Sequence, residues 1–420
     1  MPQRLTLDQV LDGFQPGATV FVPGMSGESL PLYEALRGRP EAARGVRFVG
    51  AHFPGINRSD YLGLHSEARQ RAYFMLPALR AAGLGEGSRA ELLPLDYPGA
   101  FRDLAGLSPV DLAFAQVSPP DDQGRCSLGV CCDFHPAVWA RARRRIAHIN
   151  PRMPRTAGSF SIRYDELDAA FEIEHEILAY DGGSPNDAMR AHAALVAGLV
   201  RDGDTLEFGV GKLQAAILAA LAHHRDLRVW SGMASTPVLD LLDRGVIAGR
   251  ASLTLGVALG DRSLYERAGR DEAFYFRPVS ETHDVPHMAA IRRFVAINSA
   301  VEVDLFGQVN ADAVNGRLAA GVGGLPAFAA GAALSEGGRS IIALPAATDD
   351  GRFGRIVARL SAPGVCAIPR HHADVVVTEH GVAELRGLDL HARARALIAI
   401  AAPAMRDNLS AAWAELSRAL

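Results

Sequence analysis

Three glycine-rich segments precede predicted helices, and the first two directly follow predicted strands. They are Gly24-Met25-Ser26-Gly27, Gly209-Val210-Gly211 and Gly321-Val322-Gly323-Gly324. Backbone N–H groups at such a turn, with the positive end of the helix dipole, can bind an anion or a thioester oxygen. The segment 321–324 has three glycines in four positions, which are costly to order unless the backbone needs unusual angles or a close approach to another group. The local pattern predicts either ligand loops or tight packing turns and leaves both open.

Two stretches that carry these glycines resemble each other. Residues 16–49 and 202–230 each contain a Gly/Asp turn, a strand, a glycine-rich turn, a helix and a second strand, at nearly the same spacing. Short apolar strands that alternate with alanine-rich amphipathic helices are typical of βαβ units and of a largely parallel sheet. The sequence therefore predicts an α/β fold made of two similar open α/β domains.

The break between the two halves is predicted at a cluster of turn-forming residues, 181–187 (DGGSPND), which follows a strand-like segment. A helix should begin directly after it, with Asn186 or Asp187 as its N-cap. We therefore expect an N-terminal domain over residues 1–184 and a C-terminal domain over residues 185–420.

Composition excludes several classes of function. The net charge of −4 offers no concentrated basic surface for nucleic acid. The longest apolar stretch, Leu213 to Ala222, is much shorter than the ~20 residues that cross a bilayer. The four cysteines form no C-x-x-C pair and no disulfide framework, and the N-terminus lacks the apolar region of a secretory signal. We expect no metal, no nucleic acid, no membrane, and a cytoplasmic location.

Six segments in order along the chain resemble the family of acetyl-CoA hydrolases and 4-hydroxybutyrate-type CoA-transferases. No single segment is decisive, but together they extend over much of the sequence. They are QVSPPDDQG with CSLGV (from Gln116), NPRMPRT (from Asn150), the Gly209–Gly211 turn, INSAVEVDLFGQVNAD (from Ile297), Gly321–Gly324, and VTEHGVAELRG (from Val377).

The resemblance implies a transferase or hydrolase, expected as a homodimer, with an acyl-CoA cleft between two α/β domains. Coenzyme A would take part as a thioester substrate or product, and the acceptor would be a carboxylic acid or another acyl acceptor. In the family a glutamate attacks the thioester and passes through an acyl anhydride to a glutamyl-CoA thioester. Carried over by position, the residues that would contact CoA or substrate are Gly209, Val210, Gly211, Lys212, Leu213, Gln308, Asn310, Gly321, Gly323 and Gly324.

The sequence departs from the family at the position of the nucleophile. A family segment similar to His-Thr-Glu-Met reads Trp230-Ser231-Gly232-Met233 here, so the catalytic glutamate is replaced by Gly232. Ala327 stands where the family has an aspartate, and the segment from Pro369 to His372 replaces a more polar one. Small or apolar residues at Gly232, Leu325, Pro326 and Ala327 predict an acyl group bulkier or more apolar than acetate.

Several residues are candidates to replace the lost carboxylate. Glu28 falls where the family has a Gly-Glu-Pro segment at the mouth of the cleft, and is either a base or nucleophile or a residue that orients substrate. His371 and His372 could supply a base, because histidine titrates near ~6.5. Ser231 lacks a surrounding triad pattern, and Cys126 fits a packing role within its strand.

Three hypotheses of function follow. The chain is an acyl-CoA-processing enzyme that no longer forms a glutamyl thioester at position 232, or a CoA-transferase whose nucleophile lies elsewhere, such as Glu28. Alternatively, it binds CoA or acyl-CoA without turnover.

Overall fold

The computed structural model describes residues 1–419. The chain divides into two compact units, one of which is not continuous in sequence. The first unit consists of Met1–Asp181 with Gly232–Thr236 and Gly249–Thr282, and the second of Gly182–Ser231, Pro237–Ala248 and the residues from His283 on. The boundary between residues 184 and 185 rests on the turn-forming residues 181–187 and remains a prediction.

The first unit is built on a parallel sheet, in which the strands follow the order β1-β10-β8-β6-β2-β3-β4-β5. The central strand β6 is buried along its whole length, as expected for a parallel sheet covered on both faces. The unit also holds the parallel pair β13–β14. The strand bounds are β1 Gln3–Arg4, β2 Thr19–Phe21, β3 Arg47–Val49, β4 Arg69–Ala72, β5 Ala90–Leu92, β6 Leu112–Val117, β7 Arg125–Cys126, β8 Arg144–Ile149, β9 Ile162–Arg163, β10 Ala169–Glu172, β13 Leu253–Ala258 and β14 Phe274–Phe276.

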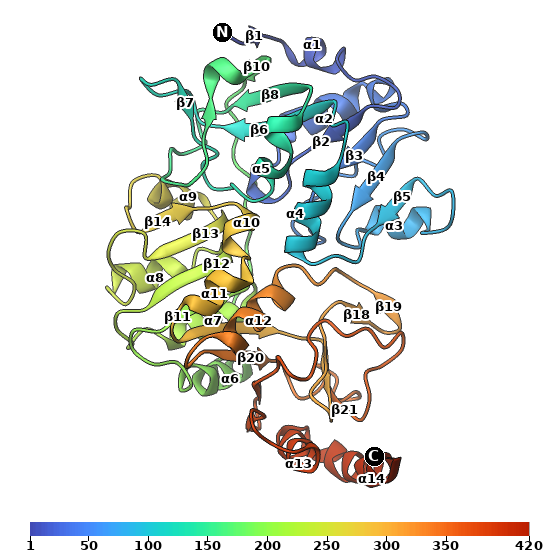
Figure 1. The fold of residues 1–420 in the computed structure, drawn as a ribbon, viewed down its shortest axis with the longest axis vertical. Helices are drawn as coiled ribbons and strands as arrows, with labels where there is room; N and C mark the ends of the chain where they lie inside the picture. The colour runs from blue at the N-terminus through green and yellow to red at the C-terminus, as the bar shows by residue number, and fades with distance from the viewer. Residues whose placement is uncertain (420) are drawn as a thin grey trace. The chain divides into compact units, whose positions relative to one another are not determined.

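Local sequence explains where the helices of this unit begin. In α2, the Ser29 hydroxyl accepts a hydrogen bond from the Leu32 amide, and a proline lies in the first turn. Its apolar face, Leu32 and Leu36, packs into the core beside β2 and β3. Helices α4 and α5 lie side by side (Figure 1). The helix bounds are α1 Leu7–Leu11, α2 Leu30–Gly38, α3 Pro77–Ala82, α4 Tyr97–Gly106, α5 His135–Val138, α9 Arg262–Ala268 and α10 Val279–Thr282.

In the second unit the strands follow the order β12-β11-β15-β20-β22-β23, with β23 antiparallel to β22. The pairs β11–β12, β11–β15, β15–β20 and β20–β22 are parallel. Small two- and three-stranded ladders complete the unit. The bounds are β11 Thr205–Phe208, β12 Arg228–Ala234 (shared with the first unit), β15 Phe294–Ser299, β16 Glu302–Asp304, β17 Val309–Asn310, β18 Ala313–Val314, β19 Arg317–Leu318, β20 Arg339–Ala343, β21 Ile356–Val357, β22 Val375–Thr378 and β23 Gly381–Glu384.

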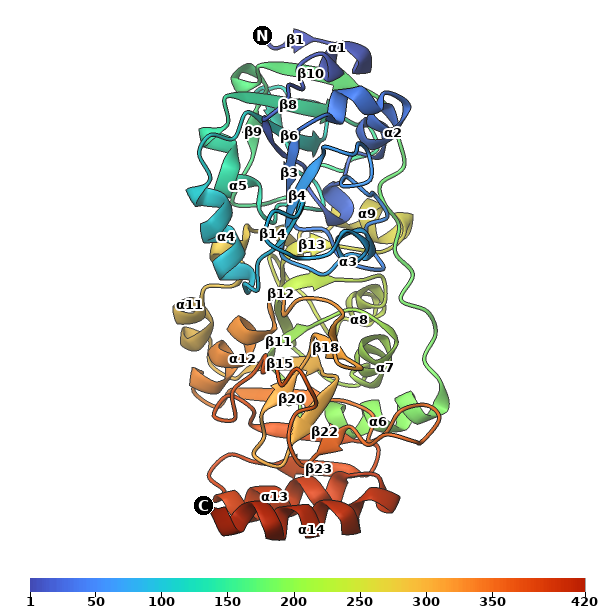
Figure 2. The same cartoon turned by 90° about the vertical axis from the view of Figure 1, so that its right-hand side faces the viewer.

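Helices cover both faces of this second set of strands. Figure 2 shows α6 and α7 on one face of β11, β15 and β20, and α11 and α12 on the other. The Asn186 side chain caps α6 by accepting the Met189 amide at 2.9 Å, as predicted. The C-terminal helices α13 and α14 lie side by side next to β23 (Figures 1 and 2). The bounds are α6 Asp187–Ala197, α7 Lys212–Ala220, α8 Val238–Asp243, α11 Val285–Ala290, α12 Leu325–Leu334, α13 Leu390–Ile400 and α14 Arg406–Leu416.

The structure confirms an α/β fold with mostly parallel sheets and two domains. Both similar stretches fold as predicted, as β2–α2–β3 and β11–α7–β12, each with its two strands parallel. Within residues 1–419, no helix is both long and apolar enough to cross a membrane.

Candidate functional site

The first glycine turn of the second unit connects β11 to α7. Gly211 has φ +116°, in the region that disfavours a side chain, and is the N-cap of α7, which begins at Lys212. A Cβ on Gly211 would meet nothing within 4 Å, so the backbone angle rather than crowding requires glycine. Residues 209–211 and Leu213 are partly buried, while Lys212 is exposed. The turn therefore presents accessible backbone N–H groups at a helix N-terminus.

Gln214, one helical turn into α7, lies beside this turn. Its side chain is 3% exposed, and its Nε2 donates to the Ile297 carbonyl at 3.2 Å. Its Oε1 is buried and has no hydrogen-bond partner among the described residues. The Gln214 Cγ is 4.0 Å from the point where a Cβ on Gly209 would stand. A buried acceptor without a partner next to an open turn is suited to an N–H or O–H group of a ligand.

Glu207 is a carboxylate that our sequence reasoning missed. It lies on β11, two residues before Gly209, and is 3% exposed. The Asn298 amide donates to its Oε2 at 2.6 Å, and burial raises the pKa of Glu207 to about 8. A charged residue within the apolar strand TLEF, directly before a glycine turn, was the available signal, because buried parallel strands are usually apolar throughout.

The second glycine segment, residues 321–324, precedes α12. Gly323 has φ +60°, and Gly324 is the N-cap of the helix. A Cβ on Gly324 would overlap the Nε2 of His283 and would lie 2.8 Å from the Cε2 of Phe328. Burial lowers the pKa of His283 to about 3, so this imidazole is neutral at physiological pH. Both backbone conformation and close packing therefore require glycine here.

Gln308 and Asn310 belong to the β16–β17 hairpin. The Gln308 Nε2 donates to Asp304 Oδ2 at 2.7 Å. The buried Asn310 amide donates to Glu302 Oε1 at 3.1 Å and to the Ala313 carbonyl at 2.9 Å. These bonds show how the two side chains stabilise the hairpin, and a contact with substrate remains a prediction.

Glu28, in the first unit, follows the 3₁₀ turn Met25–Gly27 and is 1% exposed. The Asn57 amide donates to its Oε2 at 2.8 Å, and the Tyr61 hydroxyl donates to its Oε1 at 3.4 Å. Burial raises the pKa of Glu28, while these hydrogen bonds oppose the shift. The carboxyl is thus held by side chains of its own unit, an arrangement suited to anchoring the loop.

Replacing Glu28 should therefore affect stability. Glu28→Ala leaves the buried donors of Asn57 and Tyr61 without their acceptor, so we expect a loss of about 1–3 kcal/mol in the free energy of unfolding. Glu28→Gln keeps an acceptor and should lose less. Urea unfolding of both variants measures the difference, and an unchanged midpoint for Glu28→Ala would contradict the anchoring role.

The surroundings of Gly232 within the first unit include a second buried carboxyl. A Cβ on Gly256, in β13, would stand 2.9 Å from the Gly232 carbonyl oxygen and 3.8 Å from Asp133 Oδ1. Asp133 is 5% exposed, and burial raises its pKa to about 7. Its Oδ1 has no hydrogen-bond partner within residues 1–419. The carboxyl of Asp133 and the backbone of Gly232 thus both lie close to Gly256 of β13, although Asp133 is distant from the other two in sequence.

Two family models match the chain. The acetyl-CoA hydrolase/transferase N-terminal domain matches residues 91–179, and the C-terminal domain of the same family matches residues 260–413. The 4-hydroxybutyrate coenzyme A transferase of Clostridium kluyveri is 32% identical over 422 residues, covering 96% of each chain. The chain belongs to the acetyl-CoA hydrolase/transferase family.

Other relatives in this family are similar over most of the chain. Butyryl-CoA:acetate CoA-transferase of Anaerostipes caccae is 32% identical over 75% of this chain and 73% of its own. RipA from Yersinia pestis superposes with a TM-score of 0.91 at 28% identity, covering 99% of this chain and 98% of its own. The 4-hydroxybutyrate CoA-transferase of Porphyromonas gingivalis gives a TM-score of 0.78 at 28% identity, with 100% and 98% covered.

The remaining candidates of the sequence analysis occupy varied surroundings in this family member. The Ser231 hydroxyl is buried and donates to the Phe208 carbonyl at 3.0 Å. Cys126 is buried in β7, and burial raises the pKa of its thiol to about 11, which disfavours a reactive thiolate. The rings of His371 and His372 form an edge-to-face pair 4.5 Å apart. None of these observations assigns a catalytic role.

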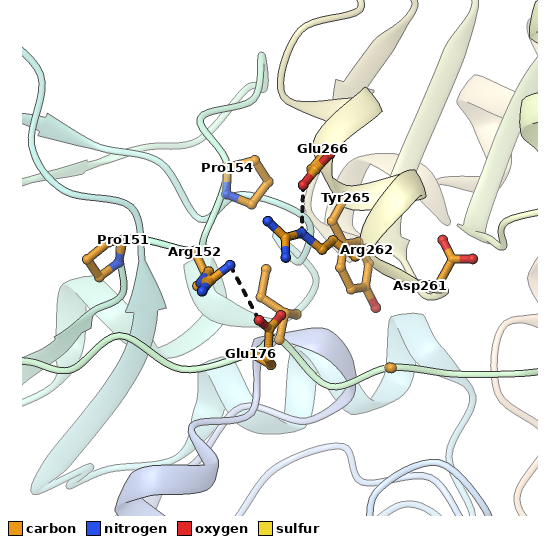
Figure 3. A pocket seen from close by; sticks show the side chains of 10 residues that line it. Pro151, Arg152, Pro154, Glu176, Asp261, Arg262, Tyr265 and Glu266 are labelled. Carbon is orange, nitrogen blue, oxygen red and sulfur yellow. Dashed lines mark hydrogen bonds and ion pairs between the residues drawn. The ribbon is translucent and has the colours of Figure 1, made fainter.

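A hollow of about 410 Å³ lies within the first unit, where Arg152 and Arg262 both line it (Figure 3). Arg152 pairs with Glu174 at 2.7 Å and with Glu176 at 3.4 Å, and Arg262 pairs with Glu266 at 2.7 Å. Because both arginines already pair with carboxylates, this hollow is poorly suited to the phosphates of a nucleotide.

Proposed function

We propose that this chain processes acyl-CoA, as a CoA-transferase or an acyl-CoA hydrolase, with a non-standard active site whose reactive group is not at position 232. The observation that carries the proposal is the match to a 4-hydroxybutyrate coenzyme A transferase over 96% of the chain. The non-standard site is proposed because Gly232 stands where the resemblance places the family nucleophile. Glycine has no side chain to acylate, so no glutamyl-CoA thioester can form at that position.

Features of the second unit support binding of a thioester. The backbone N–H groups of the Gly209–Gly211 turn and of residues 321–324 stand at helix N-termini, where a developing oxyanion is stabilised. We propose that residues 209–213 bind CoA and that Gly321, Gly323 and Gly324 lie near the acyl group. We further propose a cytoplasmic homodimer, with a carboxylic acid as acceptor.

The experiment measures free CoA and acyl exchange. Acetyl-, butyryl- and hexanoyl-CoA are each incubated with the protein, with and without acetate or butyrate, and products are followed by thiol titration and chromatography. We expect CoA release or exchange, faster for the longer acyl groups because the substituted positions are small and apolar. A clear preference for acetyl-CoA would contradict the predicted acyl specificity.

Two further results separate catalysis from binding alone. Tight binding of CoA in calorimetry without release or exchange would overturn the proposal and favour a non-catalytic acyl-CoA-binding protein. Gly232→Glu should create or increase CoA transfer if the cleft retains the family geometry. The control is Asp240→Asn, which removes an exposed carboxylate paired with Arg244.

A further inference from the structure

We propose that Glu207 is the nucleophile of this chain, so that the reactive carboxylate lies on β11 instead of at position 232 on the neighbouring strand β12. The inference rests on the proposed function, because it requires an acyl-CoA substrate. The inference assigns the reaction to a named residue. From the sequence we expected an enzyme without the family's glutamyl intermediate, whereas here a glutamyl intermediate forms at Glu207.

The strand register places Glu207 on the strand next to β12, which carries position 232. The pairing of β11 with the parallel neighbour β12 ends at Leu206 and Val229, and continuing this register by one residue gives Glu207 and Trp230 corresponding positions. Position 232 is two residues further along β12, and side chains two residues apart project from the same face of a strand. Neighbouring strands lie roughly 5 Å apart, and two residues along a strand add roughly 7 Å, so positions 207 and 232 are diagonal neighbours at about 8 Å. A glutamate at 207 therefore projects from the same face as position 232 but presents its carboxylate at a neighbouring point.

The face on which Glu207 lies is also identified by its other neighbour. Glu207 pairs in register with Ala296 of β15, and Ala296 packs against Ala327 and Phe328 of α12. Trp230 packs against the same cluster. Glu207 therefore projects from the face covered by α12, the helix whose N-terminus carries the glycine segment 321–324.

Among the residues that the structure describes, the Glu207 carboxyl is oriented by a hydrogen bond from a neutral amide and not by an ion pair with a basic side chain. Asn298, two residues after Ala296 on β15, donates to Glu207 Oε2 at 2.6 Å. Asn298 occupies Oε2 alone, so the other carboxyl oxygen, Oε1, remains for attack. Beyond the end of β11, the unpartnered Oε1 of Gln214 and the open turn at Gly209–Gly211 offer contacts for the thioester and its amide-bearing arm.

The covalent steps balance without a further reagent. Glu207 first gives up its proton to solvent, because burial raises its pKa to about 8. The Glu207 carboxylate then attacks the thioester carbonyl carbon, and the C–S bond breaks with its electron pair on the CoA thiolate. The thiolate then attacks the Glu207 carbonyl carbon of the anhydride, the acyl carboxylate leaves, and Glu207 carries CoA as a thioester. A second carboxylate reverses both steps to give a new acyl-CoA, whereas water releases CoA and regenerates Glu207.

The test combines trapping with rate measurements on the full chain. Butyryl-CoA is added, the mixture is treated with borohydride or hydroxylamine, and peptides are mapped by mass spectrometry. We expect the alcohol or hydroxamate at Glu207, and we expect Glu207→Gln to lower turnover by about 10³-fold or more. Asp133→Asn and Glu28→Gln are compared in parallel, and a thermal melt shows that each variant is folded.

Asn298→Ala adds a readout that a purely structural role of Glu207 would not change. The Asn298 hydrogen bond favours the charged carboxylate, so its loss should move the ionisation in the pH profile of kcat/KM to higher pH. Three results would each overturn the inference while leaving the proposed function intact. They are a Glu207→Gln variant as active as the wild type, a trapped adduct on Asp133 or Glu28, and a loss of rate in Glu207→Gln without any adduct in the wild type. Absence of turnover in the wild type would instead overturn the proposed function, and the inference with it.

Discussion

Glu207→Gln is expected to raise the free energy of unfolding at pH 9 by roughly 3–5 kcal/mol, at about 1.4 kcal/mol per unit of pKa difference between the folded and unfolded states. Burial raises the pKa of Glu207 from 4.5 to about 8, so the folded protein holds a proton that the unfolded chain has lost between these values. The contribution of protonated Glu207 to the free energy of unfolding of the wild type is fully present below pH 4.5 and is lost as the pH rises through about 8. Glutamine is uncharged at every pH and still accepts the Asn298 hydrogen bond.

The measurement is urea unfolding of wild type and variant at pH 4.5, 7 and 9. The difference in stability should be close to zero at the lowest pH and should grow with pH. Glu384→Gln, at an exposed site on β23, is the matched control and should give no such trend. An equal difference at all three pH values would show that Glu207 titrates normally in the folded protein.

Gly24→Ala is expected to destabilise the first unit by more than about 3 kcal/mol, because overpacking against a fixed backbone is among the costliest single changes. A Cβ at this position would overlap the Ala51 carbonyl oxygen and would stand 2.9 Å from its carbon. Ala51 closely follows β3, so relief requires movement of the backbone next to the parallel sheet. The displaced turn also leads directly into Glu28.

Gly38→Ala is the matched control for this variant. Gly38 is the last residue of α2, has no positive φ, and a Cβ there would meet nothing within 4 Å. Alanine should be neutral or stabilise by up to about 1 kcal/mol through the unfolded state. Thermal melts followed by circular dichroism compare the two variants, and similar midpoints would contradict the predicted overlap at Gly24.

Local sequence patterns were sufficient to predict much of the architecture. The repeated strand, glycine turn and helix predicted parallel βαβ units at 16–49 and 202–230, and turn residues predicted the Asn186 cap, because these features depend on neighbours within a few residues. The glycine turns were found for the same reason. Their positive φ angles at Gly211 and Gly323 agree with the residue type.

Tertiary structure alone decided the environments of the acidic residues. The sequence resemblance places Glu28 at the mouth of a cleft, whereas in the structure its side chain is buried and accepts hydrogen bonds from Asn57 and Tyr61. Asp133 approaches β12 and β13 from a segment roughly a hundred residues earlier in the chain. Burial and pKa depend on side chains that are distant in sequence, so no spacing rule could assign them.

Gly232 and Glu207 show this division together. The sequence by itself determined that position 232 has no carboxylate, because that is a statement about one residue type within a family pattern. Only the register of β11 with β12 and β15, and the cover of α12 over that face, placed Glu207 next to the strand that carries Gly232. Strand pairing joins residues far apart in the chain, and for that reason the position of a side chain across a sheet is a property of the folded structure.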